Sequence, residues 1–188
     1  MPLIYFCQAP YFIGMLYLET LIKKINAPVN REEAYPSVNS DIYRLKDVFP
    51  PQLLIIYKPQ SRHYREIGGT DEEKVIQLQT MSRLLRKYYD HSVVPMSYFL
   101  LESSGTPRIA LIRPEVLGTP LDQLPLYSPE RFEGFSKKIY WDTIWSELLE
   151  DPELTSLHPI TRRACLFSNF SLRNIIYQAP DYYYIIDW

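Results

Sequence analysis

A continuous apolar run at residues 53–57, LLIIY, limits most strongly what this chain can fold into. A strand in which successive side chains are all apolar places them on both faces, so both faces of its sheet must be covered. Pro50 and Pro51 come just before the run and mark a turn. We therefore predict a strand at 53–58 that is buried on two sides.

Other segments are predicted to surround this strand. Thr70 and Glu73 have the spacing of a capping box, which predicts that a helix begins there. Antiparallel strands with one helix between them, followed by a mainly helical part, favour an α+β fold. We expect helices at 12–25 and 132–149, a polar linker at 30–36, strands at 38–45, 93–102, 108–116, 174–177 and 182–186, and a loop at 152–158.

The scarcity of glycine excludes one class of nucleotide site. The chain has 6 glycines and 16 prolines among 188 residues, whereas glycine usually makes up about 7% of a protein. Neither GxGxxG nor GxxxxGK[ST] occurs.

A formal net charge of −2 gives no reason to expect a nucleic-acid partner. The length suits one domain or a two-lobed domain.

The sequence predicts a cytoplasmic protein. The apolar N-terminus lacks a basic start and a small-residue cleavage site, so we do not expect a secretory signal. No run of about 20 apolar residues is present to span a membrane. Two cysteines, Cys7 and Cys165, make no disulfide framework and are expected to be reduced. The sequence leaves the oligomeric state open.

The segment CLFSNFSLRNIIYQAPDYYYIIDW at 165–188 has the residue types that phosphoryl transfer requires. That chemistry needs a group near the attacking hydroxyl, and an amide and a carboxylate that hold metal. Asn169, Asn174 and Asp187 occupy such positions, with a predicted hairpin between the last two.

This segment resembles the aminoglycoside phosphotransferase and choline-kinase-like group, distant relatives of the protein kinases. The family pattern is roughly H-G-D-x-x-x-x-N-I, then a hairpin, then I-D-[FW]. The resemblance implies a two-lobed protein-kinase-like fold that uses ATP and Mg²⁺ and phosphorylates a hydroxyl of a small molecule. It implies that Asn174 and Asp187 bind metal and that Asn169 stands where the family has its catalytic-base Asp.

Upstream segments resemble the family in the same order. Ser40 lies in a polar loop and strand that resemble the phosphate loop, and Lys58 ends a strand as the phosphate-binding lysine does. Glu73 would be the helix partner of Lys58, and residues 110–121 are similar to the linker that holds adenine. The implied divisions are an N-terminal helical extension and linker at 1–36, a nucleotide-binding lobe at 37–117 and a partial C-terminal lobe at 118–188.

Three departures from the family pattern favour alternative interpretations of the function. An amide at 169 cannot accept a proton as a carboxylate does, so activity is expected to be weakened or lost. Phe167 replaces the histidine of the pattern, and the chain ends at Trp188, before the substrate helices of the family. We therefore expect a fragment, a truncated gene model or a degenerate relative. The main alternative is a non-catalytic pseudokinase that binds or regulates, and another is an unrelated α+β protein.

Each candidate residue also has a structural explanation. Glu73 could serve only the capping box with Thr70, and Gln77 competes with it for the position facing Lys58. Lys58 could be an ordinary exposed lysine, and Asn174 and Asp187 could be turn and strand-end residues. The histidines and cysteines are scattered without the spacing of a zinc site or of a nucleophilic pair.

Overall fold

The computed structural model describes the greater part of the chain. It divides into two compact units, the first formed by the described residues of 31–76 and 96–115, the second by those of 77–95 and 116–186. No helix in the described ranges is long and apolar enough to cross a membrane. The described residues are 31–89, 93–103, 106–126, 128, 141–159, 162, 172–180 and 182–186. The helix predicted at 12–25 lies outside them.

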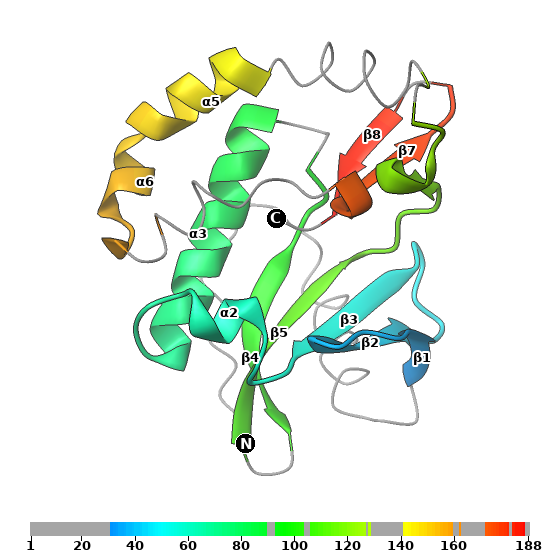
Figure 1. Cartoon of the computed structure of the whole chain (residues 1–188). Helices are drawn as coiled ribbons and strands as arrows, with labels where there is room; N and C mark the ends of the chain where they lie inside the picture. The colour runs from blue at the N-terminus through cyan, green and yellow to red at the C-terminus, as the bar shows by residue number, and fades with distance from the viewer. Residues whose placement is uncertain are drawn as a thin grey trace. The chain divides into compact units, whose positions relative to one another are not determined.

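The first unit is built on an antiparallel sheet of five strands. The strands are neighbours in the order β1-β2-β3-β5-β4, as Figure 1 shows. Their bounds are Arg31–Tyr35 for β1, Ser40–Leu45 for β2, Gln52–Tyr57 for β3, Ser97–Ser103 for β4 and Thr106–Pro114 for β5. The α+β class is thereby confirmed. The predicted strands are confirmed too, although β4 begins later than expected.

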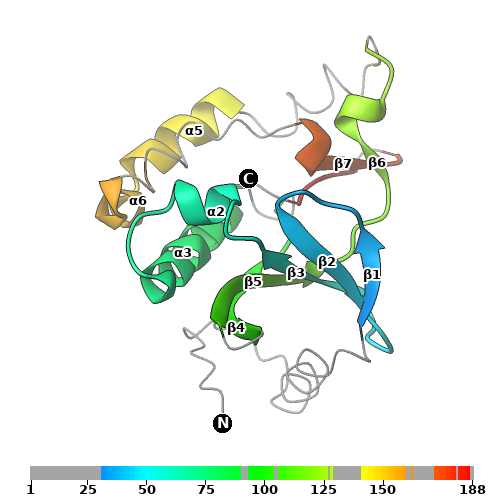
Figure 2. The ribbon, with the colours of Figure 1, turned by 60° about the horizontal axis from the view of Figure 1, so that its bottom comes forward.

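Strand β3 lies at the centre of this sheet, between β2 and β5 (Figure 2). All of its residues are buried, which confirms the strand buried on two sides. Because side chains alternate along a strand, Leu54 and Ile56 share one face. There they join a cluster of buried residues from β2, β4 and β5: Leu45, Phe99, Leu101 and Ala110.

A short helix, α2 (Arg62–Arg65), precedes the long helix α3 (Asp71–Tyr89). The predicted capping box is confirmed, because the Thr70 N–H donates to the Glu73 carboxylate at 2.8 Å and the Glu73 N–H donates to the Thr70 hydroxyl at 3.3 Å. Gly69 has φ +97°, and a Cβ there would collide with the Glu73 carboxylate. A glycine is therefore needed where the chain turns into α3.

The second unit combines a small sheet with helices. Its strands are β6 (Thr119–Pro120), β7 (Ile175–Gln178) and β8 (Tyr182–Ile185), in that order and antiparallel. The predicted final hairpin is thus confirmed. Its helices are the C-terminal part of α3, the 3-10 turns η3 (Leu121–Gln123) and η5 (Leu172–Asn174), α5 (Trp141–Glu150) and α6 (Pro152–Ser156). The residues of the predicted helix that precede α5 lie outside the described part.

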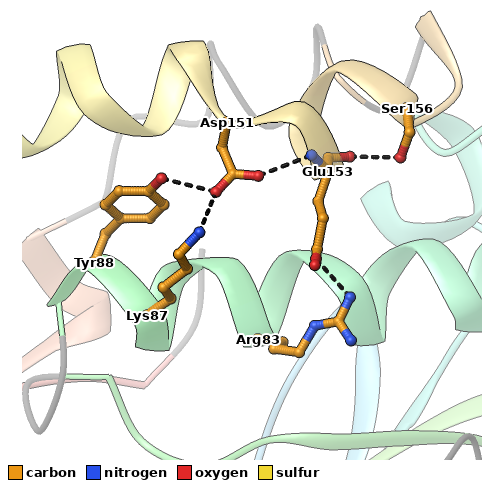
Figure 3. Close-up of polar contacts among 6 residues, drawn as sticks. All are labelled: Arg83, Lys87, Tyr88, Asp151, Glu153 and Ser156. Atoms are coloured by element: carbon orange, nitrogen blue, oxygen red, sulfur yellow. Dashed lines mark hydrogen bonds and ion pairs between the residues drawn. The ribbon is translucent and has the colours of Figure 1, made fainter.

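Asp151 connects α6 to α3 within this unit (Figure 3). Its carboxylate accepts hydrogen bonds from the Lys87 ammonium at 2.6 Å and the Tyr88 hydroxyl at 2.7 Å, and it caps α6 by accepting from the Glu153 N–H at 2.8 Å. The Asp151 side chain is only 1% exposed. The bonds from Lys87 and Tyr88 lower the pKa of Asp151 to about 2, against the opposing effect of burial.

Two predictions of irregular structure are wrong. The linker predicted at 30–36 contains strand β1, which pairs with β2. The loop predicted at 152–158 contains α6. Its start carries a sequence signal that was missed, because Asp151 followed by Pro152 combines a favoured N-cap residue with a favoured first helical residue. Strand β1 pairs with β2, the next strand in the chain, but its exposed charged residues gave no alternating apolar pattern.

Candidate functional site

Lys58 directly follows β3 and is held against the loop between β1 and β2. Its backbone N–H donates to the Asn39 carbonyl at 2.8 Å, and its ammonium donates to the Ser37 carbonyl at 3.1 Å. The Gln60 side chain donates to the Val38 carbonyl at 3.3 Å. The end of the central strand is therefore fixed to a short polar loop.

The Lys58 ammonium also forms an ion pair with Asp41, at 3.2 Å. Arg108 on β5 approaches the other oxygen of the same carboxylate, at 3.7 Å. Asp41 and Ala110 both pair with Ile56 in the sheet register. Because Lys58 and Arg108 lie two residues from Ile56 and Ala110, all three charged side chains share one face.

Ser40, predicted to line the phosphate loop, is buried. Its hydroxyl donates to the Ser37 hydroxyl at 3.1 Å. Ser40 pairs with Tyr57, so its side chain lies on the face opposite to Asp41 and Lys58. The structure thus brings the Ser40 backbone near Lys58, whereas the Ser40 hydroxyl stabilises the loop from the other side.

Glu73, the predicted partner of Lys58, takes part in the capping box described above. Its carboxylate accepts from Thr70, while Lys58 pairs with Asp41. Among the ion pairs of the described residues, none joins Lys58 to Glu73. The structural explanation of Glu73 is therefore confirmed, and its role toward Lys58 stays a prediction.

Asn174 ends η5 immediately before the hairpin of β7 and β8. Ile175 pairs with Ile185, and the Ile186 N–H donates to the Asn174 carbonyl at 2.9 Å. The hairpin therefore returns the chain to Asn174 at the residue that precedes Asp187. Asn169 and Asp187 themselves lie outside the described residues.

The segment 118–121 positions this hairpin. Gly118 has φ +156°, and a Cβ there would collide with the backbone oxygen of Tyr177. Thr119 pairs with Tyr177, and Leu121 is fully buried. The glycine permits the close approach that lets β6 join β7. The residues that resemble the family linker thus have a local structural function.

Glu115, directly after β5, forms a contact that sequence reasoning missed. Arg44 donates two hydrogen bonds to its carboxylate, at 2.7 and 2.6 Å, and the Tyr35 hydroxyl donates a third at 2.6 Å. The Glu115 side chain is 4% exposed. The bonds from Arg44 lower the pKa of Glu115, against the effect of burial. The segment that directly follows β5 is thereby bound to β1 and β2.

We expect Glu115→Gln to lower the free energy of unfolding by about 2 kcal/mol, because the amide keeps one acceptor oxygen but loses the other and the negative charge that strengthens both hydrogen bonds from Arg44. Since the folded-state pKa of Glu115 is lowered, its contribution is present above the ordinary pKa of 4.5 and is lost as the pH falls below it. Urea denaturation at pH 7 and pH 3 measures both effects. Glu66→Gln is the control, because Glu66 pairs with Arg62 at the surface. Equal effects of the two variants would contradict the prediction.

The residues present fit ATP and Mg²⁺ only in part. An amide oxygen at Asn174 and a carboxylate at Asp187 are oxygen ligands of the kind that Mg²⁺ prefers. Among the described residues there is no group of three or more His, Cys, Asp or Glu side chains that could hold a metal. Lys58 and Arg108 carry positive charge of the kind that a phosphate would require, but Asp41 pairs with both.

Comparison of the sequence with known protein families gives no match, and comparison with curated proteins gives none either.

Proposed function

We propose that this chain is a nucleotide-binding protein of the protein-kinase-like fold, similar to the aminoglycoside phosphotransferase and choline-kinase-like group. In this proposal Lys58 binds the phosphates of ATP, and Asn174 and Asp187 hold Mg²⁺. Its reaction is transfer of the γ-phosphoryl group to a hydroxyl of a small molecule, at a rate reduced by the amide at Asn169.

The observation that carries the proposal is the hydrogen bond from the Ile186 N–H to the Asn174 carbonyl, at 2.9 Å. A metal site built from Asn174 and Asp187 requires that a hairpin bring the two positions together. The β7–β8 pairing, with Ile175 opposite Ile185, has the required register. A shift of one residue would exchange the faces of the strand and remove this match.

The first unit supports the proposal independently. The resemblance implies a small antiparallel sheet lobe with one helix, and a lysine at the end of an inner strand. The sheet is antiparallel, α3 follows β3 in the chain, and Lys58 directly follows β3 beside a polar loop. The scarcity of glycine is compatible with nucleotide binding in this proposal, because Ser37 and Asn39 supply a polar loop in place of a glycine-rich one.

In the proposed reaction, the acceptor oxygen forms a bond to the γ-phosphorus while the bond from that phosphorus to the β–γ bridging oxygen breaks. Mg²⁺, when bound, neutralises charge on the phosphates. Lys58 adds positive charge at the phosphates, and Asn169 donates a hydrogen bond that orients the acceptor hydroxyl. The hydroxyl proton passes to solvent, because the amide has no useful basicity.

The second candidate function is a non-catalytic nucleotide-binding module. It is favoured by the same amide at Asn169, since binding of nucleotide and metal does not require a base. Both candidates share the binding residues and differ only in turnover.

We expect Asp187→Ala to weaken the Mg²⁺-dependent part of ATP binding at least tenfold, because a carboxylate ligand of the metal is removed. Isothermal titration calorimetry of the purified chain, with and without EDTA, measures this part. Asp122→Ala, at an exposed position of η3, is the matched control and is expected to bind as the unmodified chain does. Equal Mg²⁺-dependent binding by both variants would refute the metal site.

A further inference from the structure

The carboxylate of Asp41 lies between two cations from different strands. Lys58, after β3, reaches one oxygen at 3.2 Å, and Arg108, on β5, approaches the other at 3.7 Å. Asp41 itself belongs to β2, so three neighbouring strands each supply one charge to the same face. Two cations on one carboxylate leave an excess of one positive charge.

All three side chains remain open to solvent. The exposed fractions are 29% for Lys58, 35% for Asp41 and 23% for Arg108. Ion pairs with this exposure contribute little to stability, because water screens them and ordering the side chains costs entropy. The pairs with Asp41 can therefore be exchanged for a stronger anion without unfolding the sheet.

A phosphate group is such an anion. It carries up to two negative charges and three terminal oxygens, so it can accept from an ammonium and from a guanidinium at once. Arg108 is the better suited of the two cations, because its planar donors match the geometry of phosphate. The Lys58 N–H donates to the Asn39 carbonyl at 2.8 Å and its ammonium donates to the Ser37 carbonyl at 3.1 Å, so this lysine is held beside the loop before the ligand arrives.

We propose that Lys58 and Arg108 together bind the polyphosphate of a nucleoside triphosphate, and that Asp41 is an internal competitor that the phosphate displaces. The inference rests on the proposed function for the role of Lys58, and it adds Arg108 as a second phosphate ligand and Asp41 as a residue that limits affinity. In the free protein Asp41 forms ion pairs with both cations. In the complex they bind phosphate, and Asp41 turns to solvent.

The proposal predicts opposite effects for two neighbouring charges. Asp41→Asn removes the competing carboxylate and its repulsion of the ligand. It is expected to tighten polyphosphate binding about three- to fivefold, which corresponds to the free energy of an exposed ion pair. Arg108→Gln removes a ligand and is expected to weaken binding by a similar or larger factor. Arg108→Lys keeps the charge and is expected to restore most of the affinity.

The test is calorimetric titration of the full chain with MgATP and, separately, with inorganic tripolyphosphate at fixed ionic strength. Glu32→Gln, at an exposed position of β1, changes the net charge as Asp41→Asn does and is expected to leave both affinities unchanged. Thermal unfolding without ligand verifies that each variant is folded. If Arg108→Gln does not fold, Arg108→Lys and Asp41→Asn still decide the question.

Tighter binding by Asp41→Asn, together with weaker binding by Arg108→Gln, supports the inference. Unchanged or weaker binding by Asp41→Asn overturns it, and so does the absence of tripolyphosphate and MgATP binding in every protein tested. The proposed function fails separately, when Asp187→Ala leaves Mg²⁺-dependent ATP binding unchanged. Tripolyphosphate binding that responds to Asp41 and Arg108 would then remain as a phosphate site without the metal site.

Discussion

Asp151→Ala is expected to lower the free energy of unfolding by about 3 kcal/mol. The substitution removes the N-cap of α6, which typically contributes about 1 kcal/mol. It also removes the charge-assisted hydrogen bonds from Lys87 and Tyr88, which contribute about 1.5–3 kcal/mol where the acceptor is buried. The Asp151 side chain is 1% exposed, whereas the Lys87 side chain is 61% exposed, so water can solvate the Lys87 ammonium once the carboxylate is removed.

Urea denaturation followed by circular dichroism measures the change. Glu153→Gln is the matched control. Glu153 lies on α6 and forms an ion pair with Arg83 on α3, and both side chains of this pair are exposed. We expect a change within about 0.5 kcal/mol for this control. A comparable loss in both variants would show that the contact between α3 and α6 does not depend on the buried carboxylate.

The pH dependence of stability tests the same contact. The pKa of Asp151 is lowered from its ordinary 3.8 to about 2 by Lys87 and Tyr88. Its contribution is therefore present above about pH 4 and is lost as the pH falls through 2. We expect Asp151→Asn to be less stable at neutral pH and to lack this part of the acid destabilisation. An unchanged slope between pH 4 and 2 would contradict the assigned pKa.

Asn169→Asp is expected to raise phosphoryl-transfer turnover about a hundredfold, if the chain is an enzyme impaired at this position. A carboxylate can accept the proton of the acceptor hydroxyl, and a general base contributes about 10²–10⁴-fold. Steady-state release of ADP from MgATP, with an aminoglycoside or choline as the acceptor, measures turnover.

Gln178→Glu is the control for this substitution. It makes the same change from amide to carboxylate at an exposed position of β7, and we expect it to leave turnover unchanged. A rise in Asn169→Asp alone identifies a catalytic site that lacks only its base. Unchanged turnover in both variants, with Mg²⁺-dependent ATP binding retained, would identify the chain as a non-catalytic binding module.

Local patterns predicted the elements of the fold that depend on neighbouring residues. The apolar run at 53–57 specified a buried strand, because alternating side chains need apolar surroundings on both faces. Thr70 and Glu73 specified the start of α3, because the capping box involves residues three apart. The hairpin after Asn174 followed from two short strands around Ala179 and Pro180.

The wrong prediction for β1 has a cause that lies outside the segment itself. The segment 30–36 was assigned to a linker because its exposed charges show no period, whereas pairing with β2 makes part of it a strand. Strand β1 thus depends on hydrogen bonds to residues that follow it in the chain. Such pairings depend on the tertiary context more than on the intrinsic preference of the segment.

The sequence by itself therefore determined the central strand, the capped helix and the hairpin that begins at Asn174. Only the tertiary structure decided the partners of the charges: Asp41 with Lys58 and Arg108, Glu115 with Arg44, and Asp151 with Lys87. The physical reason is the sequence separation between the residues that interact. Helix and strand patterns involve residues a few positions apart. An acidic side chain has many possible basic partners along the chain, and only the fold selects which of them lies beside it.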